Sequence, residues 1–289
     1  MSAAVALATA IPTPGREFWR RLRRQHLAMA AAAVIVLLLL AAVFAPWIAP
    51  FDPAAPDYDS VLDGPSAAHW LGTDAFGRDI LSRIIWGGRV SLSVGVLSVA
   101  LGGVAGVVIG LISGFFGGWL DGVLMRLMDV LLAFPGIILA IGVVALLGPG
   151  IDNVIYSIAV FSMPVFARLV RGSTLALKQT LYVQAARSIG VSRAALMLRH
   201  ILPGAMPGVI VYASLRLGTS ILTAASLSFI GLGARPPSPE WGAMLAEGRS
   251  YLGVADHLTL FPGLAIFVTV LAFNLLGDGL RDALDQKLR

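Results

Sequence analysis

The sequence predicts an all-α, polytopic membrane protein with six transmembrane helices. Hydrophobic residues make up 57% of the 289 positions, only 13% are charged, and the mean hydropathy is +0.85. Soluble domains carry about twice this proportion of charge, and charge this sparse cannot cover the surface of a soluble protein of this size. The apolar residues also fall into long blocks, as they do in chains that cross a bilayer repeatedly. These observations exclude a disordered chain and an ordinary soluble enzyme.

Six apolar blocks are near or above the roughly 20 residues that a helix needs to cross the hydrocarbon. The first block follows a run of arginines, but it is too long for the apolar part of a signal peptide and more blocks follow, so we expect a retained helix. A Gly-Pro-Gly turn separates the third block from the fourth. The predicted spans are residues 27–48, 91–114, 121–147, 152–171, 205–230 and 258–279.

The distribution of charged residues predicts that both termini lie in the cytoplasm. Lys and Arg gather before the first span, between the fourth and fifth, and after the sixth, whereas acidic residues gather in the two other long connections. Basic residues near span ends favour the cytoplasmic side. This bias accounts for the net charge of +5 without a nucleic-acid partner. The predicted parts are a cytoplasmic N-terminal segment, a first transmembrane helix, an extracytoplasmic segment, a transmembrane core and a cytoplasmic tail: residues 1–26, 27–48, 49–90, 91–280 and 281–289.

The sequence contains no recognisable catalytic or metal-binding pattern. There is no cysteine, so there is no disulfide and no thiol nucleophile. Neither lysine, Lys178 nor Lys287, lies in a G-x-x-x-x-G-K-[ST] motif, so we expect no ATP hydrolysis by this chain. The histidines form no H-E-x-x-H motif, and no G-x-S-x-G motif is present. We therefore expect neither an enzyme nor a cofactor or metal bound by this chain.

Glycines recur at every fourth position through the second predicted span. Four-residue spacing keeps them on one helix face, where the missing Cβ allows the backbone of another helix to approach closely. The pattern therefore predicts a packing seam rather than a phosphate-binding loop. The glycines of the seam are Gly102, Gly106, Gly110 and Gly114, and Gly118 and Gly122 continue the spacing.

Three charged residues within the apolar blocks are candidates for a polar pathway. Arg126 and Asp129 are three residues apart, so they share a helix face and can pair. Arg216 lies inside the fifth predicted span. It is either a paired structural charge, an arginine that reaches the inner interface, or a group lining a pathway, and the sequence leaves these alternatives open.

The segment 180–203 predicts two short helices on the cytoplasmic side, over residues 181–189 and 192–200. Gly190 ends the first, Ser192 caps the second, and Pro203 ends the unit. Ala185 and Ala186 give a small face that allows close packing, with basic residues beside them. A projecting helix pair with such a face is typical of a docking element.

This segment resembles the EAA loop of permease subunits of bacterial ABC importers, which reads E-A-A-x-x-x-G with a later Leu-Pro. The chain departs from the family at Gln184, where Glu is usual, so the hydrogen bonding is kept and the charge is lost. The resemblance implies that the loop inserts into a cleft of an ATP-binding subunit and transmits its closure to the membrane helices. The residues implied in this coupling are Gln184, Ala185, Ala186, Arg187, Gly190, Leu202 and Pro203.

Two further stretches resemble the C-type permeases of peptide and nickel importers. One is LGTDAFGRD at 71–79, and the other is LSFIGLG at 227–233 with the prolines and Glu-Trp-Gly that follow it. Residues 199–204 and 275–285 look most like permeases of dipeptide and glutathione importers. The resemblance implies the type I ABC importer permease fold in the bacterial inner membrane.

The same resemblance implies import of short peptides, dipeptides or glutathione, by alternating access. The implied partners are a homologous second permease, two ATP-binding subunits that hold ATP and Mg²⁺, an extracytoplasmic solute-binding protein and the lipid bilayer. Two alternatives stay open: a nickel or oligopeptide importer permease of the same family, and an ion-coupled secondary transporter. The second requires ionisable groups near the midplane and an inverted repeat, and the sequence has no such repeat.

Overall fold

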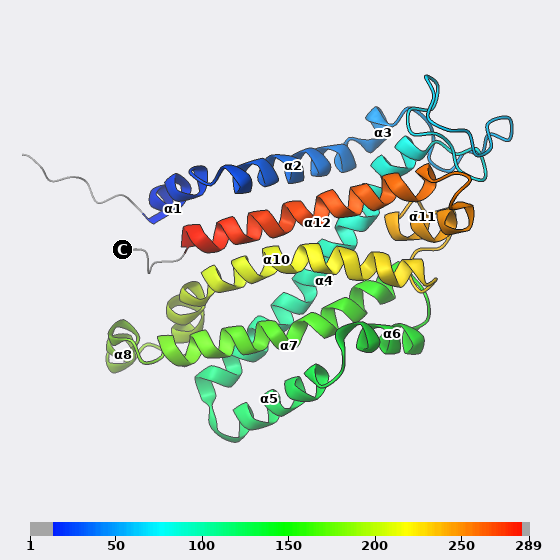
Figure 1. Ribbon diagram of the computed structural model, residues 1–289. Coiled ribbons are helices and arrows are strands. Elements are labelled where there is room, and N and C mark those ends of the chain that lie inside the picture. The colour runs from blue at the N-terminus through cyan, green and yellow to red at the C-terminus, as the bar shows by residue number, and fades with distance from the viewer. Residues whose placement is uncertain (1–13, 285–289) are drawn as a thin grey trace, which may run out of the picture.

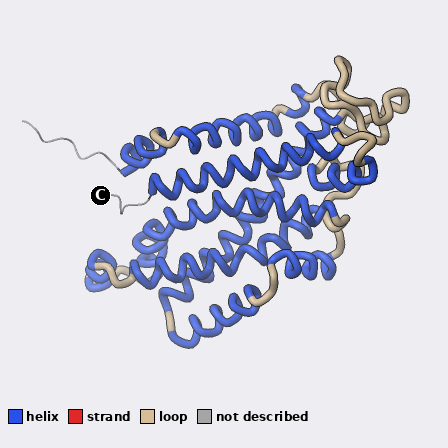
Figure 2. The backbone as a smooth tube through the Cα atoms, viewed as in Figure 1, coloured by secondary structure: helices blue, strands red, loops and turns tan. Residues whose placement is uncertain are grey.

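The computed structural model describes residues 14–284, and within them the chain is helical with no strand (Figures 1 and 2). The all-α prediction is confirmed. Residues 1–13 and 285–289, which include parts of both predicted cytoplasmic ends, lie outside the described residues. In chain order the elements are α1 Pro14–Arg23, α2 His26–Val43, α3 Ala45–Ile48, α4 Ile80–Phe116, α5 Gly118–Leu132, α6 Gly136–Leu147, α7 Ile151–Leu177, α8 Leu181–Ser188, α9 Arg193–Ala195, the π-helical turn η1 Leu196–Ile201, α10 Leu202–Phe229, α11 Trp241–Gly248, the 3-10 turn η2 Arg249–Tyr251 and α12 His257–Leu284.

Within the described residues, five helices are long and apolar enough to cross a membrane, and a bent pair, α5 with α6, makes a sixth candidate. The expectation of one continuous helix over 121–147 is wrong. α5 and α6 meet at a bend of 94°, and Pro135 between them has an extended backbone. Proline lacks the N–H that a helix needs and disfavours helical geometry at the preceding Phe134.

The second span begins much earlier than the apolar block suggests. α4 starts at Ile80 rather than at residue 91, because the Asp79 side chain caps it by accepting the backbone N–H of Ser82 at 2.7 Å. It ends at Gly117, whose φ of +68° breaks the helix. The last part of the predicted extracytoplasmic segment 49–90 is therefore the first part of a long helix.

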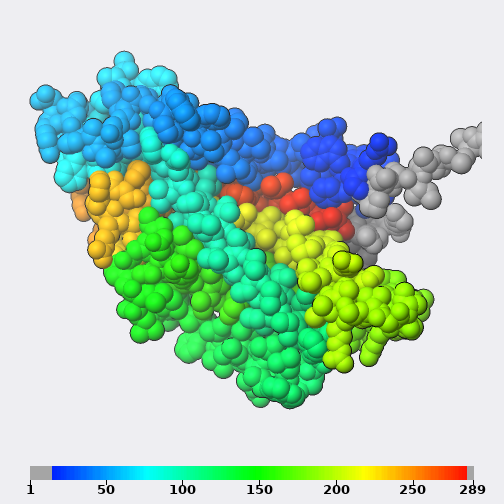
Figure 3. Space-filling model, turned by 180° about the vertical axis from the view of Figure 1, so that it is seen from behind, coloured from blue at the N-terminus to red at the C-terminus, as the bar shows by residue number. Residues whose placement is uncertain are grey.

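α4 and α7 make the most extensive contact between helices, and the predicted glycine seam forms it. A Cβ at Gly102 would lie 2.6 Å from the carbonyl oxygen of Ala159, and a Cβ at Gly106 would lie 2.5 Å from that of Met163. Such distances are far inside van der Waals contact, so only glycine allows this approach. Figure 3 shows α4 running diagonally across the back of the molecule.

The seam ends where α4 ends. Gly118 and Gly122 were expected to continue it, but they lie on α5, beyond the break at Gly117. A Cβ at either position would meet no other atom within 4 Å. Their spacing is thus not part of the packing between α4 and α7.

α2, α12, α10 and α7 lie side by side, and α4 crosses behind them (Figure 1). α10 packs against α4, α7, α12 and α11. Its face turned away from α4 is left open by the rest of the described chain, and this face bears Thr219 and Leu222, which are both exposed.

Candidate functional site

The turn of segment 180–203 has the predicted geometry. Gly190 has φ +82°, a conformation that L side chains rarely adopt. The N–H of Gly190 donates to the Arg187 carbonyl and that of Val191 to the Ala186 carbonyl, each at 3.1 Å, which closes α8. Ser192 Oγ then accepts the backbone N–H of Ala195 at 3.3 Å and caps α9, so the two predicted signals are confirmed.

The second half of this segment differs from the prediction. α9 continues through the π-helical turn η1 directly into α10, which starts at Leu202 with Pro203 in its first turn. Pro203 does not end the unit, because a proline in the first turn of a helix removes an N–H that has no intrahelical partner there. The second half of the projecting loop, residues 193–201, is therefore a helical extension of α10.

The two alanines of the segment point to different sides of α8. Ala186 is buried together with Val183, against Leu196 and Ile201 of η1. Ala185 is exposed. The expected common face of Ala185 and Ala186 is thus wrong, because consecutive helix positions are about 100° apart.

The outward side of α8 carries a row of apolar side chains that we call the docking ridge: Leu181, Ala185 and Ile189. Leu181 is 84% exposed and Ile189 is 82% exposed. Spacing by four residues places them on one side. Leu181 and Ile189 were not among the sequence candidates, although their four-residue spacing about Ala185 was a readable signal.

The polar candidates lie beside the ridge. Gln184 is exposed, and its Nε2 donates to the Gln179 carbonyl at 3.1 Å, so the side chain is held across the start of α8. Arg187 is exposed one turn further along. The ridge, an amide and a cation therefore share the accessible side of this short helix.

The buried side of α8 belongs to a larger hydrophobic cluster. Val183 and Ala186 share that cluster with Phe166 and Val170 of α7 and with Val209 of α10. Leu202 packs against the same cluster. A displacement of α8 therefore acts on α7 and α10 through close-packed side chains.

The predicted pair of Arg126 and Asp129 does not form. Asp129 pairs instead with Arg168 of α7, with 2.5 Å between Nη2 and Oδ1, and Arg126 is exposed. A second ion pair joins the same two helices: Arg171 of α7 donates to both carboxylate oxygens of Asp121 of α5, each at 2.6 Å. α5 is thus fastened to α7 by two arginines that α7 supplies.

Arg216 lies near the middle of α10, about 20 Å along the helix from either end. Its guanidinium stacks over the Phe161 ring, 4.1 Å from the centroid, and its Nε donates to Ser162 Oγ at 3.3 Å. Among residues 14–284 no carboxylate pairs with it, and its Nη2 is buried without a hydrogen-bond partner. An arginine side chain is much shorter than 20 Å, so neither pairing within the described chain nor reach to the inner interface accounts for this charge.

The LGTDAFGRD stretch forms part of a buried ion cluster with α4 and α11, which we call the Arg83 cluster: Asp74, Arg78, Arg83 and Glu247. Arg78 donates to Asp74 at 2.7 Å and to Glu247 at 2.8 Å, and Arg83 donates to Glu247 at 3.1 Å. Arg83 is fully buried. The cluster joins segment 49–79 to α4 and α11. No pattern in the sequence indicates that Glu247 belongs to it.

Residues 106–289 match the family described as "binding-protein-dependent transport system inner membrane component". The chain belongs to this family. Residues 13–65 also match the N-terminal transmembrane domain of oligopeptide transport permease C. The permease is therefore a subunit of an ABC importer, and the ion-coupled alternative no longer applies. Membership in a family of membrane transport components agrees with a chain that is not itself an enzyme.

Curated relatives resemble the permease over almost its whole length. The glutathione transport system permease protein GsiD of Escherichia coli O157:H7 is 57% identical over 280 residues, which cover 96% of this chain and 92% of the relative. The protein of the same name from Shigella sonnei strain Ss046 gives the same values.

Solved structures share the fold. One of the MetNI methionine ABC transporter, in inward-facing conformations, has a TM-score of 0.57 at 21% identity and covers 71% of this chain and 97% of that chain. A crystal structure of an amino acid ABC transporter with histidines has a TM-score of 0.53 at 18% identity and covers 68% of this chain and 92% of that chain. These likenesses confirm the expected ABC importer permease fold.

Proposed function

We propose that this permease carries short peptides across the inner membrane, with glutathione as the favoured cargo and dipeptides as the nearest alternative. The observation that supports the cargo is the 57% identity, over 96% of the chain, to a glutathione transport permease. The match of the N-terminal region to an oligopeptide permease domain favours peptides over nickel within the family.

The proposed assembly contains a homologous second permease, two ATP-binding subunits and an extracytoplasmic solute-binding protein. One six-helix chain encloses only part of a pathway, so a second permease is needed to complete it. ATP and Mg²⁺ are held by the ATP-binding subunits. Both termini and the 180–203 loop lie in the cytoplasm, as the distribution of basic residues favours.

In this proposal the docking ridge inserts into the cleft of an ATP-binding subunit. Leu181 and Ile189 supply exposed apolar area for burial, and Gln184 supplies a hydrogen bond. Closure of the ATP-binding subunits displaces α8, and the shared cluster passes the displacement to α7 and α10. Since these helices border the open face of the molecule, their movement opens the pathway to one side and closes it on the other.

The Gln184 amide makes this contact without a net charge. Its Nε2 is already bound to the Gln179 carbonyl, which leaves the side-chain carbonyl oxygen as an acceptor toward the partner. We expect Gln184→Glu to be tolerated, because the position is exposed and the shape is kept. Uptake within about twofold of wild type supports this, since exposed charges are worth little.

Uptake of radiolabelled glutathione into proteoliposomes that contain the whole importer tests the cargo. We expect ATP-dependent uptake that requires the binding protein and is competed by unlabelled glutathione and not by Ni²⁺. The purified permease alone should hydrolyse no ATP. Uptake of a dipeptide or of nickel, with none of glutathione, would reject the proposed cargo, and ATP turnover by this chain alone would reject the division of roles.

A further inference from the structure

One side of α10 carries a line of polar residues that we call the α10 stripe: Arg216, Thr219, Thr223 and Ser226. Their spacing of three and four residues places them on one face. This is the open face of α10, opposite the residues that pack against α4 and α12, such as Ile221 and Gly218. Polar residues at this depth of a membrane helix are costly unless they serve a polar partner.

The cation of the stripe is incompletely satisfied. Arg216 is held by the Phe161 ring, by Ser162 and, weakly, by Thr219 Oγ1 at 3.5 Å. None of these partners carries a negative charge, and Nη2 has no hydrogen-bond partner in the described chain. Nη2 is enclosed by the chain, so the side of the guanidinium that meets the open face is the one that carries Nη1, beside the exposed Thr219. A carboxylate is the planar acceptor that fits a guanidinium.

The hydroxyls of the stripe have the opposite character. Thr219, Thr223 and Ser226 each donate their proton to a carbonyl of α10 itself, at 3.0, 2.8 and 2.8 Å. What they present outward is therefore lone pairs, which accept hydrogen bonds. A molecule that lies along the stripe must offer an anion at one end and N–H donors beyond it.

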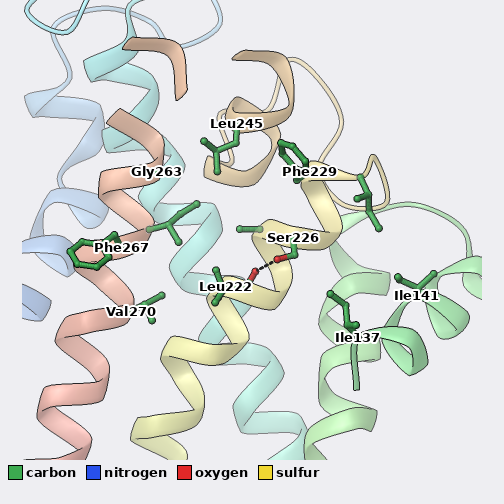
Figure 4. A pocket seen from close by; sticks show the side chains of 12 residues that line it. Ile137, Ile141, Leu222, Ser226, Phe229, Leu245, Gly263, Phe267 and Val270 are labelled. Carbon is green, nitrogen blue, oxygen red and sulfur yellow. Dashed lines mark hydrogen bonds between the residues drawn. The ribbon is translucent and has the colours of Figure 1, made fainter. Parts of the chain in front are cut away.

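The dimensions select a short peptide. Arg216 and Thr223 are seven residues apart on the helix, which is about 10 Å. Three residues of extended chain also span about 10 Å. Beyond Thr223 the stripe runs into an apolar cavity of about 590 Å³ between α6, α10, α11 and α12, where Ser226 lies among side chains such as Ile137, Leu245 and Phe267 (Figure 4).

We propose that the α10 stripe is a binding site for a peptidic cargo, in which Arg216 binds a carboxylate and the threonine hydroxyls accept peptide N–H groups. This rests on the proposed function for the identity of the cargo. The site lies on α10, and the docking ridge lies on α8, which packs against η1 at the start of α10 through the cluster of Val183 and Ala186 with Leu196 and Ile201.

The first test needs no cargo. In the assembled importer in lipid nanodiscs, Thr219→Cys is treated with two methanethiosulfonate reagents, one carrying a sulfonate and one a trimethylammonium, each normalised to its rate with free cysteine. The native chain has no cysteine, so its mass reports the reaction. We expect about a tenfold preference for the anion. The Arg216 guanidinium lies 3.5 Å from the Thr219 hydroxyl that the thiol replaces, so its charge attracts the sulfonate and repels the trimethylammonium. Arg216→Gln should remove the preference, Arg216→Lys should keep it, and Arg20→Gln, at an exposed site on α1, should leave it unchanged.

The outcomes separate the alternatives. Val104 of α4 is 65% exposed, and Val104→Cys should not react, because we expect that face to meet lipid. No reaction at position 219 means that the face is covered, and a preference that Arg216→Gln leaves unchanged means that another charge sets it. A missing anion preference means that an acidic group of the second permease neutralises Arg216. Each of these results overturns the proposal.

The second test uses an analogue of the cargo, S-methylglutathione, whose blocked thiol does not consume the methanethiosulfonate reagent. S-methylglutathione should slow the labelling of Thr219→Cys at least fivefold, and its diamide, which lacks both carboxylates, should not. Equal protection by both compounds, or by neither, overturns carboxylate binding by Arg216. Absence of glutathione uptake by the intact importer is instead the failure of the proposed function, and it leaves the charge preference at position 219 unaffected.

Discussion

Gly190 should be the residue whose replacement most cleanly separates backbone geometry from contact in the 180–203 loop. Its φ is +82°, and a Cβ built there meets no atom within 4 Å. Space is therefore available, and the whole effect of a side chain comes from the left-handed backbone. That conformation costs an L residue about 1–2 kcal/mol, with β-branched residues at the upper end.

This penalty competes with the packing of α8. Val183 is the main side chain that fixes α8 against η1, and burial of a valine contributes about 1.5–3 kcal/mol. A loss of 1–2 kcal/mol lowers the population of the native turn about 5- to 30-fold. Gly190→Val should therefore offset most of the free energy that holds α8 against η1, so that displaced positions of α8 become populated, while the helices of the membrane region stay packed.

The assay is glutathione uptake per ATP hydrolysed in the reconstituted importer, with the amount of ATP-binding subunit retained on the purified permease pair. We expect Gly190→Val to lower uptake at least fivefold. Gly190→Asn is the matched control, because asparagine tolerates the left-handed region, and it should stay within about twofold of wild type. Wild-type uptake and retention by the valine variant would show that the loop is not the coupling element. Equal losses in both variants would show that the side chain, and not the backbone, is responsible.

Three further predictions concern packing and topology. Gly106→Ala should lower the free energy of unfolding by about 1–3 kcal/mol, measured by thermal or denaturant unfolding. Gly103→Ala is the control and should be neutral, because its Cβ would lie at an ordinary 3.5 Å from Phe166. Equal effects of the two substitutions would argue against the seam. Glu247→Gln should destabilise the purified permease by about 2–3 kcal/mol in the same assay, because the buried guanidiniums of Arg78 and Arg83 lose the carboxylate that they share. No change in stability would show that the Arg83 cluster is not structural. Cysteines that replace Ser60 and Ser238 should react with a membrane-impermeant thiol reagent from outside intact cells, and reaction of a cysteine at Ser188 would overturn the orientation.

Local signals in the sequence predicted those parts of the fold that depend on local geometry. The glycine seam, the end of α8 at Gly190 and the cap at Ser192 each follow from one residue or one spacing. The break between α5 and α6 was also readable, because Pro135 stands inside an apolar block. The length of that block concealed it, since hydropathy averages over a single proline.

The remaining features depend on tertiary contacts that spacing does not encode. Asp129 has an arginine three residues away, yet it pairs with Arg168 from another helix. Arg216 is informative only once the absence of an acidic partner on α7, α10 and the other described helices is known. The docking ridge likewise depends on a tertiary contact. α8 packs against η1 through Val183 and Ala186, and this burial determines that the side with Leu181, Ala185 and Ile189 is exposed.

α4 is long enough that a small tilt at its glycine seam moves its far end by a large distance. Its 37 residues extend about 55 Å, well beyond the roughly 30 Å of hydrocarbon. The end that carries Arg83 in the ion cluster lies about 30 Å from Gly102, where α7 grips the helix backbone. A tilt of about 5° at Gly102 therefore displaces the Arg83 end by about 2.5 Å, which is enough to break a hydrogen bond. In the proposed function, a small rotation of α7 driven from the 180–203 loop would be enlarged in this way at the contacts of α11 on the opposite surface.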